Sequence, residues 1–204
     1  MPRAPKYDRQ EALDQAVRLF WARGYHATSL KHLEQSLNMR PGSLYAAFGS
    51  KESLFLEALD RYAATMFHEL QGHIEREPTA LDALKAFLRE LVLGGTVGTE
   101  PPARACMIVK TLLEVSEDDE PLRSRVNALL GSMELAIEQL LKRAIAQGEI
   151  RPDTDPERLA RVVQVQIMGL RTYAQRELNA GILEPLLADV FSLLDSYRPL
   201  PSTA

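Results

Sequence analysis

Residues 29–48 read SLKHLEQSLNMRPGSLYAAF, and the interpretation of the whole chain starts from this stretch. Thr28 or Ser29 can cap a short helix, and Asn38 tolerates the left-handed conformation at its end. Pro41 suits the first turn of a second short helix. Two short helices joined by a tight turn are typical of a helix-turn-helix, whose second helix enters the major groove of DNA. A helical hairpin with no nucleic-acid role has the same spacing.

The distribution of charge favours DNA over the bare hairpin. Residues 1–51 hold eight Lys/Arg and four Asp/Glu, whereas the chain as a whole has a net charge of −4. A basic head on an acidic body indicates an anionic partner for the head, and phosphate contacts dominate the affinity of DNA-binding proteins.

Helical spacing of apolar residues continues along the whole chain, and no run has the alternation of a strand. The sequence therefore predicts an all-α fold of about nine helices. Besides the pair above, we expect helices at about 8–23, 51–75, 80–93, 103–115, 121–147, 156–178 and 185–197, with a loop at 94–102. Asp8 and Asp155 are expected caps, as is Ser50 before the helix at 51.

Composition excludes several classes of protein. Apolar residues make up 46% and charged residues 25% of the 204 residues, as in ordinary globular proteins. No apolar run exceeds five residues, so we expect no membrane span or signal peptide, and we expect the cytoplasm as location. With one cysteine, no intrachain disulfide can form.

Motifs of common enzymes are missing from the sequence. It has no G-x-S-x-G, no H-E-x-x-H and no P-loop, and no Glu stands three residues before any of its four histidines. We therefore expect no catalytic residues, no metal site and no cofactor.

Residues 9–59 resemble the TetR family of transcriptional regulators. The family signature is matched at Phe20, Gly24, Tyr25, Thr28 and Ser29, then at Gly42, Ser43, Leu44, Tyr45 and Phe48, and finally at Ser50, Lys51, Glu52 and Leu54. The resemblance implies a three-helix DNA-binding head at 1–50 and a helical ligand-binding and dimerisation domain at 51–204. It also implies a homodimer that binds double-stranded operator DNA and is released by a small-molecule inducer.

The expected DNA-binding residues lie in and around the second short helix. Gly42 allows close approach of the backbone, and Ser43 can bond to a base edge or a phosphate. The resemblance makes Lys51 a phosphate-gripping lysine and Thr28 a helix cap whose amides face phosphate. Family members often carry a basic or polar residue at position 41 and aromatic or basic residues at positions 46 and 47, where this chain has Pro41, Ala46 and Ala47. Phosphate contacts must therefore rely on cations elsewhere in the head. The full set is Thr28, Ser29, Lys31, Arg40, Pro41, Gly42, Ser43, Leu44, Tyr45 and Lys51, with Arg3 and Lys6 in the N-terminal arm and His32 as a lesser candidate.

The body is expected to hold the inducer pocket and the dimer interface. Met and aromatic side chains suit an adaptable apolar pocket, although each of them also suits ordinary core. The pocket candidates are Met66, Phe67, Phe87, Cys106, Met107, Leu112 and Met133. The resemblance places the interface on the last two helices, where Gly169 lies in an apolar stretch.

Cys106 supports an alternative, a regulator that senses oxidants or electrophiles. We expect it in the first turn of a helix with Lys110 one turn on and Arg104 nearby, and positive potential favours the reactive thiolate. The sequence favours the other interpretation, a buried cysteine that acts as a small apolar residue. A helical module that binds a protein partner is a further alternative.

Overall fold

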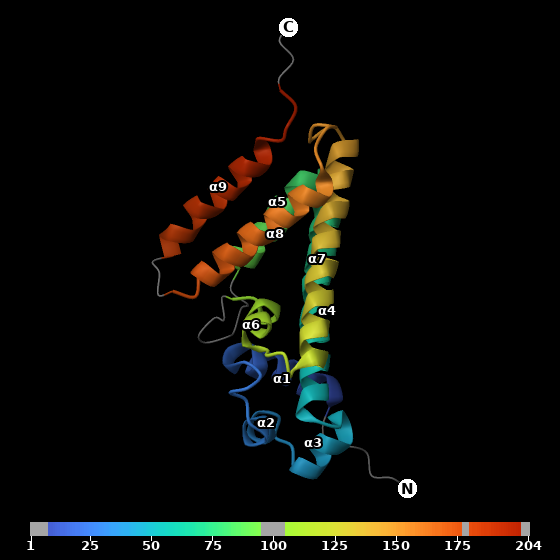
Figure 1. The fold of residues 1–204 in the computed structure, drawn as a ribbon, viewed down its shortest axis with the longest axis vertical. Coiled ribbons are helices and arrows are strands. Elements are labelled where there is room, and N and C mark those ends of the chain that lie inside the picture. Colours follow the sequence, from blue (N-terminus) through green and yellow to red (C-terminus); the bar gives the residue numbers. More distant parts are fainter. Residues whose placement is uncertain (1–7, 95–104, 177–179, 201–204) are drawn as a thin grey trace. The chain divides into compact units, whose positions relative to one another are not determined.

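The computed structural model describes residues 8–94, 105–176 and 180–200, and all regular structure in these ranges is helical (Figure 1). The predicted all-α fold is confirmed. The elements are α1 (Arg9–Arg23), α2 (Leu30–Ser36), α3 (Pro41–Phe48), α4 (Lys51–Arg76), α5 (Ala80–Leu93), α6 (Met107–Glu114), α7 (Glu120–Ala146), α8 (Pro156–Tyr173), a short 3-10 turn η1 (Ala180–Ile182) and α9 (Leu183–Asp195). No helix in the described ranges is long and apolar enough to cross a membrane.

The chain forms two compact units. The head unit comprises residues up to Met66 together with Met107–Leu129, and the body unit comprises Phe67–Cys106 and the residues from Leu130 on. Helices α4 and α7 each contribute residues to both units, and α6 belongs to the head unit. The compact units therefore differ from the functional domains expected at 1–50 and 51–204, which stay a prediction.

The core of the head unit is aromatic. Phe20 and Phe55 meet edge to face with ring centroids 4.7 Å apart, and the Tyr25 ring lies 4.8 Å from Phe55. Trp21 and Tyr62 form a second edge-to-face pair at 5.3 Å. Aromatic pairs in this geometry stabilise a core beyond the area that they bury. They join α1 to α4, and α1 in turn packs against α2.

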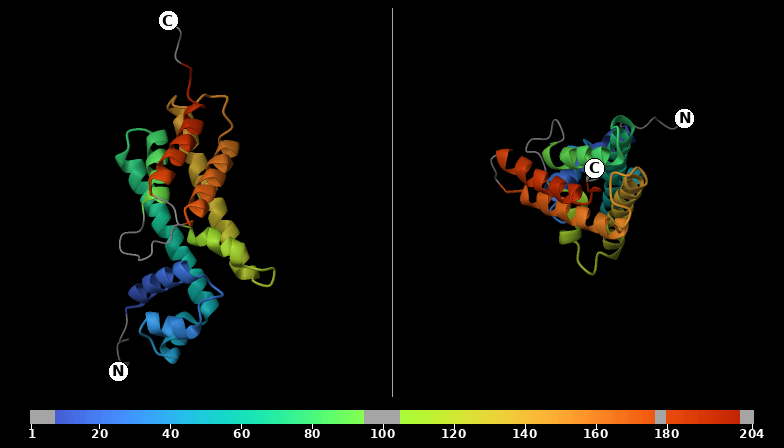
Figure 2. Two further views of the ribbon diagram at one scale, coloured as in Figure 1. Left: turned by 90° about the vertical axis from the view of Figure 1, so that its left-hand side faces the viewer. Right: turned by 90° about the horizontal axis from the view of Figure 1, so that it is seen from above.

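Helices α5, α8 and α9 pack together in the body unit, and α8 and α9 lie side by side in the views of Figure 2. Polar contacts hold α5 at its N-terminus and along its length. The Glu149 carboxylate accepts hydrogen bonds from the backbone N–H groups of Ala80 and Leu81, at 3.1 and 3.2 Å. Lys85 forms an ion pair with Asp195 of α9, with 2.6 Å between Nζ and Oδ1.

The expected helix caps are present. The side chains of Asp8, Ser29, Ser50 and Asp155 each accept a hydrogen bond from a backbone N–H in the first turn of the helix that follows. These caps satisfy N–H groups that have no partner within the helix, so they fix where the helices begin.

The start of α6 corrects one prediction. The helix begins at Met107, so Cys106 lies just before the first turn and not within it. Residues 95–102, expected as a loop, and Arg104 lie outside the described residues.

Glycine is required where α1 ends. Gly24 has φ = +84°, and a Cβ atom there would lie 2.6 Å from Oε2 of Glu114. That oxygen accepts a hydrogen bond of 2.8 Å from the Tyr25 N–H, and the second carboxylate oxygen accepts one from the His26 N–H. A side chain at position 24 would therefore both strain the backbone and displace the Glu114 carboxylate.

Lys110, one turn before Glu114 in α6, holds the same end of α1. Its Nζ donates to the carbonyl oxygens of Trp21 and Ala22, at 2.6 and 3.3 Å. These carbonyls belong to the last turn of α1, where a helix has acceptors without partners and its dipole favours a positive charge. Partial burial lowers the pKa of the Lys110 amine, and the Glu114 charge acts in the opposite direction.

We expect Gly24→Ala to lower the free energy of unfolding by more than about 1 kcal/mol, because the left-handed backbone costs about that much in an L-residue and Glu114 must move as well. Gly148 has a similar φ of +74° but open space around its Cα. Gly148→Ala should therefore cost less than Gly24→Ala. Urea denaturation followed by the fluorescence of Trp21 measures the free energy of unfolding of both variants. Equal losses of stability in the two variants would show that Glu114 does not restrict position 24.

Candidate nucleic-acid interface

Helices α2 and α3 form the helix-turn-helix that the sequence predicts (Figure 1). Asn38 in the turn has φ = +49°, the left-handed conformation expected there. Leu33, Leu37 and Met39 are buried beneath the two helices. The turn is therefore fixed by its own core and by one residue that tolerates a positive φ.

The N-terminus of α3 is open to solvent. Pro41, Gly42 and Ser43 are all exposed, and nothing lies within 4 Å of the position where Gly42 would carry a Cβ. The N-cap residue Arg40 makes no side-chain cap, so its guanidinium is available to other groups. Backbone N–H groups at an uncapped helix N-terminus attract anions such as phosphate.

Cations near α2 and α3 are not neutralised by carboxylates. Lys31 and Arg40 are exposed, and neither takes part in an ion pair among the described residues. Elsewhere in the head unit, Arg9 pairs with Glu57 at 2.7 Å and Arg61 pairs with Asp14 at 2.8 Å. Lys31 and Arg40 therefore give the helix-turn-helix a positive potential that a phosphate backbone would neutralise.

Lys51 lies at the start of α4 and is held by an aromatic ring. Its Nζ lies 4.3 Å from the centroid of the Tyr25 ring, and the residue is half-buried. Partial burial lowers the pKa of this amine, and the charge of Glu114 acts in the opposite direction. The cation–π contact limits the directions in which the amine can point.

The match to known proteins covers both parts of the chain. Residues 12–58 match the family model of the bacterial regulatory proteins of the tetR family, and residues 80–182 match the tetracyclin repressor-like C-terminal domain. A structure of the TetR family transcriptional regulator CifR, a cysteine variant in complex with a 26-bp double-strand operator DNA, is 33% identical and superimposes with a TM-score of 0.83. The match covers 97% of this chain and 100% of that one.

This chain belongs to the TetR family. The HTH-type transcriptional repressor ComR of Escherichia coli (strain K12) is 29% identical over 169 residues, 83% of this chain and 80% of ComR. The reduced form of E. coli NemR, at 23% identity and a TM-score of 0.75, shares the fold. The TetR resemblance of the sequence is thus confirmed, and the expected regulator class with it.

Two of the expected DNA-binding residues are buried. Thr28 is completely buried and its hydroxyl donates to the Gly24 carbonyl oxygen at 2.6 Å, so its side chain faces the protein. Ser29 alone caps α2 by its side chain. Leu44 is 2% exposed because it lies on the inner side of α3. Thr28 therefore does not cap α2 as expected, and neither the Thr28 nor the Leu44 side chain reaches solvent, whereas contact with DNA through the backbone at these positions stays a prediction.

Of the other expected DNA-binding residues, Tyr45 is exposed on α3 and His32 takes part in the cap of α2. Tyr45 is 46% exposed, so its hydroxyl is free to meet a phosphate. His32 closes a capping box at the start of α2, in which its Nδ1 accepts from the Ser29 N–H at 3.1 Å. This structural role was not predicted. A Ser with His three residues on replaces the usual Ser and Glu of such a box.

The predicted pocket residues do not converge on one described cavity. Met66, Phe87, Met107 and Met133 are buried, and Leu112 is half-buried. Phe67 alone of the candidates lines a described groove, which lies between α4 and α7. The other assignments to a pocket stay predictions.

Cys106 is buried, and the Lys110 amine that was expected near its thiol donates to carbonyl oxygens of α1. The described residues contain no group of His, Cys, Asp and Glu that could hold a metal ion.

Proposed function

We propose that this TetR family member is a transcriptional repressor that binds a two-fold symmetric operator as a homodimer and leaves it when a small molecule binds. The observation that carries the proposal is the exposed N-terminus of α3, surrounded by cations without carboxylate partners. Helix α3 would enter the major groove, as the second helix of such units does. Operator-bound CifR supports the same assignment by similarity.

The exposed residues divide into two roles. Lys31, Arg40 and Lys51 would neutralise phosphates, which gives affinity without sequence preference. Ser43 and the adjoining backbone at Gly42 would approach base edges. Ala46 is exposed and apolar, and such a residue can contact a thymine methyl group.

Helix α6 gives the head unit a means of responding to an effector. Lys110 and Glu114 hold the last turn of α1 and the backbone that follows it. A shift of α6 would therefore move the end of α1 and, with it, the segment that leads into α2. An effector would favour one position of α6 only to the extent that it binds the two conformers with different affinity.

The dimer would use the outer face of α8 together with α9. The inner face of α8 carries Val163, Gln164 and Ile167, and the Gln164 amide donates to the Leu130 carbonyl oxygen at 2.8 Å. On the outer face, Val165 is 64% exposed and Gly169 has open space around it. An apolar face without cover in one subunit is typical of an interface between subunits.

The proposal places the protein in the cytoplasm with the DNA and gives it no catalytic role. Oxidant sensing at Cys106 has less support, because the thiol is buried and the Lys110 amine donates to backbone carbonyl oxygens of α1. No feature of the described residues favours the partner-binding module over a DNA-binding head.

We expect Lys51→Ala and Ser43→Ala to differ in kind. Lys51→Ala removes a phosphate contact, so it should weaken binding to all DNA sequences about equally and reduce the slope of log affinity against log salt concentration by about 1. Ser43→Ala should instead change the base preference. Fluorescence anisotropy with the DNA upstream of the protein's own gene, at several salt concentrations, measures both. Equal affinity of the native chain for random DNA would contradict the proposal, and the opposite pattern in the two variants would exchange their roles.

We expect Gly169→Arg to give monomers that no longer bind the operator, since a long charged side chain would stand in the apolar interface. Analytical ultracentrifugation measures the mass. Ala146→Arg is the control, because it adds the same charge at an exposed position on α7. A stable dimer of the Gly169→Arg chain would place the interface elsewhere.

A further inference from the structure

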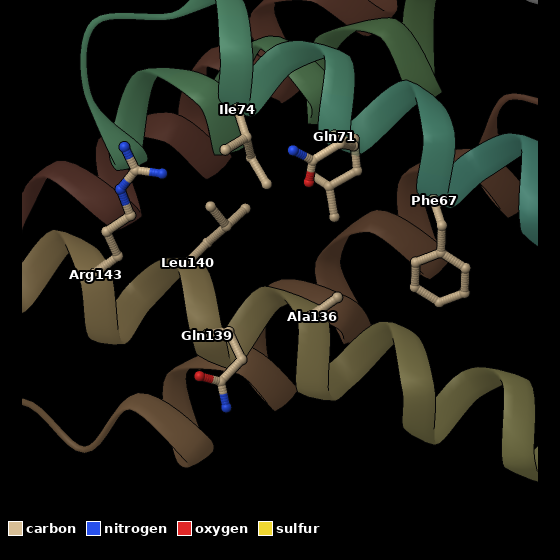
Figure 3. A pocket seen from close by; sticks show the side chains of 8 residues that line it. Phe67, Gln71, Ile74, Ala136, Gln139, Leu140 and Arg143 are labelled. Atoms are coloured by element: carbon tan, nitrogen blue, oxygen red, sulfur yellow. The ribbon is translucent and has the colours of Figure 1, made fainter.

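A groove runs between the C-terminal halves of α4 and α7 in the body unit (Figure 3). Its volume of about 400 Å³ falls within the range of small-molecule sites, about 300–1,000 Å³. Apolar side chains make most of its lining, namely Phe67, Leu70, Ile74, Ala136 and Leu140. In Figure 3 the labelled members of this set project from both helices toward the space between them.

Arg143 is the one charged side chain in the lining, and it lies at the opposite end from Phe67 (Figure 3). Within the described chain it takes part in no ion pair. Its neighbour Lys142 pairs with Glu138, and Arg161 of the same unit contacts Glu134 at 3.0 Å. A guanidinium presents a planar fork of donors that matches a carboxylate.

The length of the groove limits its occupant. Phe67 and Ile74 are two helical turns apart on α4, as are Ala136 and Arg143 on α7, so the apolar floor is about 10 Å long. The two glutamines of the lining are neutral, and the Gln71 amide already donates to Glu75 at 2.9 Å. The groove therefore offers a ligand one cation at one end and an apolar lining along the rest of its length.

We infer that this groove binds a monocarboxylate with an apolar tail, with the carboxylate on Arg143 and the end of the tail at Phe67. The inference deepens the proposed function, because it names the chemical class of the effector. Helices α4 and α7 both continue from the groove into residues of the head unit. A ligand that contacts both helices favours the conformers in which their spacing fits it.

Calorimetry with sodium octanoate tests the site. The native chain should bind octanoate at least about tenfold more tightly than octanol or octylammonium, since a charge-assisted hydrogen bond contributes about that factor. Arg143→Gln should lose about the same factor toward octanoate. Lys142→Gln removes one positive charge from the adjacent residue outside the lining, and it should bind octanoate as the native chain does.

A second variant fills the groove and leaves Arg143 in place. Ala136→Trp should abolish octanoate binding without changing the dimer mass in the ultracentrifuge. Equal binding of octanoate by the native and Arg143→Gln chains, or of octanol and octanoate by the native chain, would overturn the inference. Loss of the dimer in the Ala136→Trp chain would show that the groove is a contact between proteins, which also overturns it.

The role as effector has its own readout. Octanoate should release the native chain from its operator and leave the Arg143→Gln complex intact at the same concentration. Octanoate binding at Arg143 without release would overturn the effector role. If the chain binds no operator DNA, the proposed function fails, whereas the calorimetry still decides whether the groove holds a carboxylate.

Discussion

The Glu114 carboxylate is the contact on which the head unit depends. It accepts the N–H groups of Tyr25 and His26, which follow α1 and have no partner in a helix or a sheet. Position 24 must be glycine because the carboxylate occupies the space where a side chain would begin. The Tyr25 N–H is partly buried, and such a backbone donor is costly when unpaired, so the carboxylate from α6 fixes the path between the first two helices.

The fixed corner determines what the helix-turn-helix presents to solvent. Thr28 is buried against Gly24, and Ser29 is thereby left to cap α2 and to begin the helix-turn-helix at a defined residue. Lys31 on α2 and Arg40 before α3 form no ion pair among the described residues, whereas Arg9 of α1 and Arg61 of α4 are paired. These cations give the helix-turn-helix a positive potential on a chain whose net charge is −4.

Local signals made the helices and the helix-turn-helix predictable from the sequence. Caps at Ser29 and Asp155 and the left-handed Asn38 are fixed by short-range chemistry. Burial is not local, because the side of α3 that carries Leu44 faces the core only after packing. The role of Glu114 joins residues about ninety positions apart, and the groove at Arg143 joins α4 to α7. No spacing within one helix could have indicated either contact.

Amide hydrogen exchange of Tyr25 and His26 in Glu114→Gln shows whether this carboxylate fixes the end of α1. The Gln side chain accepts only through its one carbonyl oxygen, because its NH₂ group is a donor, so one of the two backbone N–H groups loses its partner. We predict exchange at least about tenfold faster at that amide and weaker operator binding with unchanged base preference. Glu117→Gln, an exposed neutralisation just beyond α6, should change neither quantity. Exchange rates in Glu114→Gln equal to those of the native chain would contradict the account.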